Sequence, residues 1–141
     1  MERNVRIETL QIVKQDDSKE KFANQLEGTL TEKNATFIRY NEQVDEVNVN
    51  VTVKIAPDAI KIIRKGDINM TLHFQEGQPT KTFYHIPEGK MLLMVNTLSI
   101  IHFVDEAGGK LKIHYELYQD DDKMGTYQYE IKYKEIKDEL N

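Results

Sequence analysis

The amino-acid sequence predicts an all-β protein, a closed or nearly closed antiparallel up-and-down β-barrel of eight to ten strands. Three observations support this prediction. Apolar residues recur at every second position along most of the chain, and almost nowhere with the helical period. The 3 prolines and 7 glycines fall mostly between these alternating runs, where turns are expected. One long run also changes phase midway, which is typical of a bent strand that serves both sides of a barrel.

The alternating runs indicate ten strands in a single domain that covers residues 1–141. In the clearest run, from Val47 to Ile55, valines alternate with polar residues, as in a strand with one buried and one solvated face. A helical turn fits only near Asp16 to Lys21 or at the tail. The predicted strands span residues 4–15, 20–32, 35–42, 46–56, 59–65, 68–76, 80–86, 90–105, 110–119 and 125–136.

Turn residues suggest registers for three hairpins. Loops at 66–68 and 121–123, and a turn at 76–79, each place apolar residues opposite one another on a single face. Gly66 is available for a positive φ. The predicted cross-strand pairs are Arg64 with Met70, Leu72 with Tyr84, Leu117 with Tyr127 and Tyr115 with Tyr129.

The segment 90–105 has two phases. Met91 to Thr97 alternate in one phase, and Leu98 to Val104 in the opposite phase, so a bulge is predicted near Leu98 to Ile100. A bent strand is what barrel closure requires, and closure removes the exposed edges of an open sheet. A barrel is therefore favoured over an open sandwich.

Composition excludes several classes of function. The chain has 141 residues and a formal net charge of −5. It has no cysteine, and this absence excludes thiol nucleophiles and thiolate metal sites. The start of the chain does not resemble a signal peptide, and the run from Met91 to Val95 is too short to cross a bilayer. We expect a cytoplasmic protein without a membrane partner. The acidic balance argues against nucleic acid as a partner.

A local basic face does not change that expectation. Lys61, Lys65 and Arg39 are predicted on outer strand surfaces near Phe37. In the sequence they are interleaved with acidic residues, Glu42 and Asp67, and this makes a weak platform for nucleic acid.

The order and spacing of several segments resemble a known family. Ile60 to Gly66, with Met70 and Phe74 following, is similar to the central hairpin of the YwiB-like proteins, small bacterial β-barrels of the calycin (lipocalin-like) kind. Later residues continue the resemblance across most of the chain. It implies an antiparallel up-and-down barrel and supplies no catalytic residues. These later residues are Tyr84, Pro87, Gly89, the run to Thr97, Gly109, Leu111, Tyr115 and Leu117.

The candidate ligand-binding residues lie on the predicted inner face. Arg64 is in phase with Ile60 and Ile62, so its guanidinium either binds a ligand carboxylate or phosphate or closes the barrel end. Several tyrosines share the inner face, and they suit either an amphipathic ligand or a packed aromatic core. The tentative lumen site consists of Arg64, Tyr84, Tyr115, Tyr127 and Tyr129.

No pattern indicates catalysis, a cofactor or a metal. The four histidines lie on four different strands, so we expect no metal site. No nucleophile motif or phosphate-binding glycine loop is present, so the enzyme question stays open and leans toward no. Two functions remain. The first is a non-enzymatic binding protein for a small amphipathic or anionic ligand in the lumen. The second is a solid-core barrel that acts as a structural or protein-interaction module through its outer surface.

Overall fold

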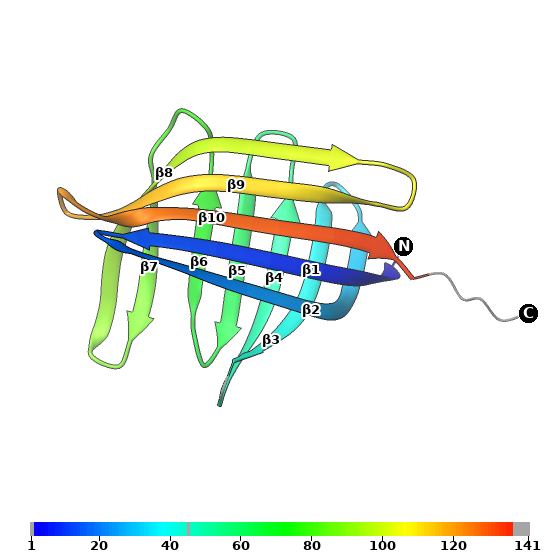
Figure 1. Ribbon diagram of the computed structural model, residues 1–141, viewed down its shortest axis with the longest axis horizontal. Coiled ribbons are helices and arrows are strands. Elements are labelled where there is room, and N and C mark those ends of the chain that lie inside the picture. Colours follow the sequence, from blue (N-terminus) through cyan, green and yellow to red (C-terminus); the bar gives the residue numbers. More distant parts are fainter. Residues whose placement is uncertain (1, 45, 137–141) are drawn as a thin grey trace, which may run out of the picture.

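Ten antiparallel strands close into one barrel in the computed structural model, which describes residues 2–44 and 46–136 (Figure 1). Each strand pairs with the next along the chain, and β1 pairs with β10 to close the barrel, so the predicted up-and-down barrel is confirmed. Within those ranges no helix is long and apolar enough to cross a membrane. The strands are β1 (Glu2–Gln15), β2 (Ser18–Glu32), β3 (Thr36–Val44), β4 (Val47–Ile55), β5 (Ile60–Gly66), β6 (Met70–Phe74), β7 (Thr80–Ile86), β8 (Gly89–Val104), β9 (Gly108–Gln119) and β10 (Asp122–Glu135).

β1, β2, β9 and β10 cross β3 to β7 at a steep angle, and β8 runs beside β7 at its start and beside β9 at its end (Figure 1). The five strands β1, β2, β8, β9 and β10 have 12 to 16 residues, and we call them the long-strand half. The strands β3 to β7 have 5 to 9 residues and form the short-strand half. A tight turn at Asp16 and Asp17 joins β1 to β2, at one of the two places where the sequence allowed a helical turn. The other place, at the tail, lies outside the described residues.

The barrel interior is filled by every second residue of the strands. On β4, Val49, Val51, Val53 and Ile55 are all buried, while Asn50 between them is exposed. The inward phase predicted from the alternation is therefore confirmed on this strand. The core takes residues from both halves of the barrel, so neither half has a separate core.

One of the three predicted hairpin registers is confirmed. Arg64 pairs with Met70, and Gly66 has a φ of 128°, a conformation that favours glycine. At the 76–79 turn the prediction is wrong by two residues, because Met70, and not Leu72, pairs with Tyr84.

The third predicted register, between β9 and β10, is also wrong by two residues. Tyr115 pairs with Tyr127, and Leu117 pairs with Gly125. The turn is a tight one at Asp120 and Asp121, with Asp120 at a φ of 56°, and a bulge follows between Lys123 and Gly125. A shift of two residues keeps each side chain on its own face, so periodicity alone could not detect it.

The predicted bulge in β8 is confirmed. The β8 register against β9 shifts between Thr97 and Ser99, which leaves Leu98 as the extra residue. Thr97 is buried before the bulge, and the half-buried side chain of His102 lies in the inner phase after it. The bulge therefore lets one strand face the core along its whole length.

Main-chain pairing is incomplete at one corner. β2 pairs with β3 only between Gly28 and Glu32, so residues 18–27 pair with β1 alone. Phe22 has an inward phase but is 48% exposed because of this separation.

Candidate functional site

Aromatic side chains fill the middle of the barrel. The rings of Tyr115 and Tyr127 stack with centroids 5.3 Å apart, and Phe74 meets the Tyr115 ring edge-on at 4.7 Å. The hydroxyls of Tyr40 and Tyr129 are 2.8 Å apart and hydrogen-bonded to each other inside the core. Three of the four tyrosines predicted for the lumen therefore lie in a packed aromatic cluster, which is the structural alternative considered above.

Burial makes the tyrosine hydroxyls weak acids. Desolvation raises the pKa of Tyr40 to about 12 and the pKa of Tyr115 to about 12. Desolvation also raises the pKa of Tyr129, and its neighbour Tyr40 raises it further. The positive charge of Arg64 lowers all three pKa values, although less than burial raises them.

Arg64 lies in the same lateral row of the barrel as Tyr40, because Val51 is the cross-strand neighbour of both. It is half-buried, and its Nε atom is buried without a hydrogen-bond partner. It forms no ion pair with a carboxylate among the described residues. Glu42, also in the inner phase, has a buried Oε2 atom without a partner. Buried polar groups usually have partners, so these two atoms are exceptions at this end of the barrel.

The remaining predicted residue, Tyr84, is half-buried and pairs with Met70, which in turn pairs with Arg64. The structure thus brings Arg64 together with Tyr115 and Tyr129, and places Tyr84 two strands away from Arg64. Sequence reasoning missed Tyr40 and Glu42, although both share the phase of Ile38 on the same strand.

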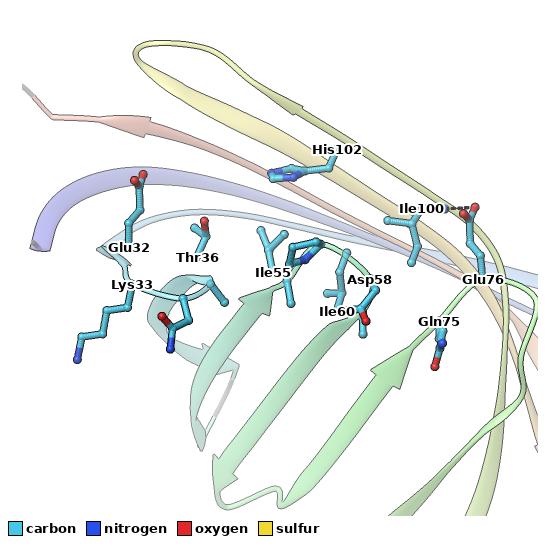
Figure 2. Close-up of a pocket in the computed structure, with 15 residues that line it drawn as sticks. Glu32, Lys33, Thr36, Ile55, Asp58, Ile60, Gln75, Glu76, Ile100 and His102 are labelled. Carbon is cyan, nitrogen blue, oxygen red and sulfur yellow. Dashed lines mark hydrogen bonds between the residues drawn. The ribbon is translucent and has the colours of Figure 1, made fainter.

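The largest cavity described has a volume of about 720 Å³ and lies at the other end of the barrel (Figure 2). Its apolar walls include Ile55, Ile60 and Ile100, which come from the ends of β4 and β5 and from β8. Figure 2 shows Asp58 and Glu76 beside these isoleucines. We call this space the mouth cavity. Sequence reasoning missed it because the loops of three hairpins, together with β8, form it.

The polar groups of the mouth cavity differ in whether they already have hydrogen-bond or ion-pair partners within the protein. Glu76 Oε2 accepts a hydrogen bond from the Ile100 amide at 2.9 Å, and Glu32 is bound to Arg3 at 2.7 Å. His102 lies 2.9 Å from the Tyr133 hydroxyl through Nε2, and burial lowers the pKa of its imidazole. Asp58, which is exposed, has no ion-pair partner among the described residues. The cavity therefore combines an apolar wall with a carboxylate-rich rim.

The histidines are spread over the molecule. His73 and His85 lie on the outer face of β6 and β7, opposite Lys61 and Lys90. Among residues 2–44 and 46–136, no three histidine or acidic side chains gather in a group that could hold a metal.

Comparison with known proteins identifies the fold. A family model described as "Domain of unknown function (DUF1934)" matches residues 5–131. The "Uncharacterized beta-barrel protein YwiB" of Bacillus subtilis (strain 168) is 27% identical over 101 residues, which cover 72% of this chain and 71% of that protein. The crystal structure of the ywiB protein from Bacillus subtilis superposes with a TM-score of 0.85 at 22% identity, over 96% of this chain and 94% of that one. The resemblance found in the residues is thereby confirmed.

Proposed function

Since this chain belongs to the DUF1934 family of YwiB-type β-barrels, whose description names no reaction, we propose its function from the chemistry of its own cavities. We propose a non-enzymatic binding protein that holds a small amphipathic molecule in the mouth cavity. The observation that carries this proposal is the cavity itself. Its volume of about 720 Å³ falls within the roughly 300 to 1,000 Å³ typical of small-molecule sites.

The walls of the cavity define the chemistry of the ligand. Ile55, Ile60 and Ile100 offer an apolar surface for the body of the molecule. Asp58 at the rim offers acceptors for a donor or a cationic group, while Glu32 and Glu76 already accept hydrogen bonds within the protein. The proposed ligand at this end therefore has an apolar body and a hydrogen-bond donor at one side.

The Arg64 end is a second location, suited to an anionic ligand. The unpartnered Nε of Arg64 favours it, together with the unpartnered Oε2 of Glu42. The contacts proposed there are those predicted from the sequence, namely Arg64, Tyr84, Tyr115, Tyr127 and Tyr129. This location ranks second because side chains fill the centre of the barrel beside it.

A filled centre also favours a second function. Tyr129, Ile113 and Ile131 are almost fully buried and lie in a continuous core. A barrel packed in this way supports the alternative of an interaction module that works through its outer surface.

Native mass spectrometry of the protein purified from its source tests the ligand proposal. We expect a retained small mass in the wild type and its loss in Ala59→Trp, because a tryptophan at that position fills the mouth cavity. Ala23→Trp, on an exposed stretch of β2 that does not line the cavity, is the matched control and should retain the mass. A wild type without any bound mass, or an Ala59→Trp variant that keeps it, would contradict the proposal.

A further inference from the structure

The outer surface of the short-strand half carries an unusual charge distribution. Cross-strand pairing places the outward side chains of β3 to β7, and of β8 as far as the bulge, on one continuous face. No outward strand position of this face is a carboxylate, although the protein has 24 acidic residues and a net charge of −5. The cations among these outward residues are Arg39, Lys54, Lys61, Lys65, Lys81 and Lys90.

The cations of this face contact aromatic rings rather than carboxylates. Arg39 and Lys54 lie over the Phe37 ring, 5.2 Å and 5.8 Å from its centroid, and Lys90 lies over the Phe83 ring at 5.7 Å. Lys54 lies directly opposite Lys61, and like charges at such positions repel. None of the six cations forms an ion pair with a described carboxylate. Asp67, in the loop at the edge of the face, has its Oδ2 occupied by the Asn48 amide at 2.8 Å. The face therefore presents positive charge that no described carboxylate neutralises.

The order of residues along the chain does not reveal this face. Glu42, which interrupts the basic residues along the chain, lies in the inner phase of β3 and buries its Oε2 atom. The two central hairpins then bring His73, Lys81 and His85 beside the lysines of β5, and these residues line a common groove. Only the fold brings together charges from strands that are distant in the sequence.

Most of the cations lie in two rows on either side of a row that contains Ile63 and Phe83. Lys54 and Lys61 pair in the first row, Lys90 lies in the second opposite His85, and Arg39 lies in the row between them, opposite Thr52. Lys65, four residues beyond Lys61 on β5, lies about 13 Å from the first row. Between the rows, Phe83 is 50% exposed and pairs with Leu92.

The groove over this face determines which polyanion fits. It has a volume of about 460 Å³, and its lining includes Lys61, Lys65, Lys81, Ile63 and Phe83 without any carboxylate. Phe83 lies among these lysines with half of its side chain exposed, and Lys90 Nζ lies 5.7 Å from its ring centroid. Proteins that bind single-stranded nucleic acid combine a positive groove for the phosphates with aromatic rings for the bases.

We propose that this cationic face binds single-stranded nucleic acid, with the lysine rows on the phosphates and Phe83 stacking on a base. The proposal is independent of the ligand in the mouth cavity, because it uses none of the residues that line that cavity. The acidic net charge argued against nucleic acid as a partner. The proposal reverses that expectation, because binding depends on the local electrostatic field of this face.

Fluorescence anisotropy with labelled oligouridylate and oligothymidylate of about 12 nucleotides tests the proposal. We expect binding at low salt that weakens as salt rises, with a logarithmic slope of about −0.7 for each phosphate neutralised. The two oligonucleotides distinguish RNA from DNA, and binding to either supports the proposal. Absence of binding to both at low salt would overturn it.

Paired variants locate the site. Lys61→Gln/Lys81→Gln should weaken binding at least ten-fold and reduce the salt slope by about 1.4, because two phosphate contacts are lost. The matched control Lys132→Gln/Lys134→Gln removes two exposed lysines from β10 in the long-strand half and should leave affinity within two-fold. Equal losses in the two double variants would overturn the assignment of the face.

Two further measurements distinguish base stacking on Phe83 from simple charge attraction. Phe83→Ala should weaken binding by about ten-fold and leave the salt slope unchanged, because a stacked base and no phosphate contact is lost. Poly-glutamate carries negative charge without bases and should compete poorly. Equal competition by poly-glutamate, or binding to phosphatidylglycerol vesicles without binding to the oligonucleotides, would overturn the proposal in favour of a generic acidic partner or a membrane surface.

Discussion

The two halves of the barrel share one core but differ in how their surfaces handle charge. In the long-strand half, ion pairs join neighbouring strands, for example Lys110 to Glu130 at 3.2 Å and Arg3 to both Glu32 and Glu135. Each half places lysines opposite one another, Lys110 with Lys132 in the long-strand half and Lys54 with Lys61 in the short-strand half. Only in the short-strand half is there no outward strand carboxylate beside such a pair. Because both halves build the same barrel, folding does not require the unpaired cations. The nucleic-acid surface that we propose lies on the half without outward strand carboxylates.

The largest effect should come from the shared interior. Val51→Asp places a carboxylate at a position that is 1% exposed, and we expect a loss of about 4 kcal/mol or more in the free energy of unfolding. Asn50→Asp, on the outer face of the same strand and opposite Lys65, should change stability by no more than about 0.5 kcal/mol. Chemical denaturation of both variants checks this prediction, and equal losses would show that the two faces of β4 are not distinct.

A smaller effect should appear at alkaline pH, because the two halves share the buried tyrosines. The folded-state pKa values of Tyr40 and Tyr115 are about 12, above the value of about 10 in an unfolded chain. The folded state then holds more protons than the unfolded state, so stability is fully present below pH 10 and is lost as the pH rises to about 12. We expect a loss of about 2 kcal/mol or more between pH 10 and pH 12.

Denaturant titrations at several pH values measure this loss. Tyr115→Phe, from the long-strand half, and Tyr40→Phe, from the short-strand half, should each make the pH dependence shallower. A flat profile for the wild type over this range would mean that the tyrosines are solvated.

Arg64→Met should have a modest effect, because the substitution removes a half-buried charge together with its desolvation cost and keeps much of the apolar stem. We expect a change within about 1 kcal/mol and an unchanged bound mass in native mass spectrometry. The pKa of Tyr129 should rise further in this variant, because the charge of Arg64 lowers it. Loss of a bound mass without loss of stability in the ligand-free protein would instead place the ligand at the Arg64 end.

The smallest effect tests the comparison of the two surfaces directly. Lys61→Glu turns a repulsive pair into an attractive one opposite Lys54 and should stabilise the protein by about 0.5 kcal/mol. Glu130→Gln removes the ion pair with Lys110 and the carboxylate opposite Lys112, and it should destabilise the protein by a similar amount. Thermal melts at low salt measure both changes. If both substitutions changed the stability in the same direction, the result would argue against the charge difference between the two halves.

The sequence by itself determined the strands, their inward phase and the bulge of β8. The physical reason is local, because a period of two in apolar residues fixes which side of a strand is buried. The alternation from Val47 to Ile55 and the change of phase at Leu98 therefore appear directly in the structure. The inner location of Arg64 follows from the same periodicity.

Only the tertiary structure decided the registers, the cavities and the cationic face. A shift of two residues preserves the alternation, so the bulge between Lys123 and Gly125 could change the pairing of β10 without a trace in the periodicity. The mouth cavity and the cationic face each combine residues from several hairpins, and their existence depends on which strands lie side by side. The closure of the barrel buries the Oε2 atom of Glu42 and leaves Lys61 and Lys81 on one groove, and it thereby determined where the proposed binding surface lies.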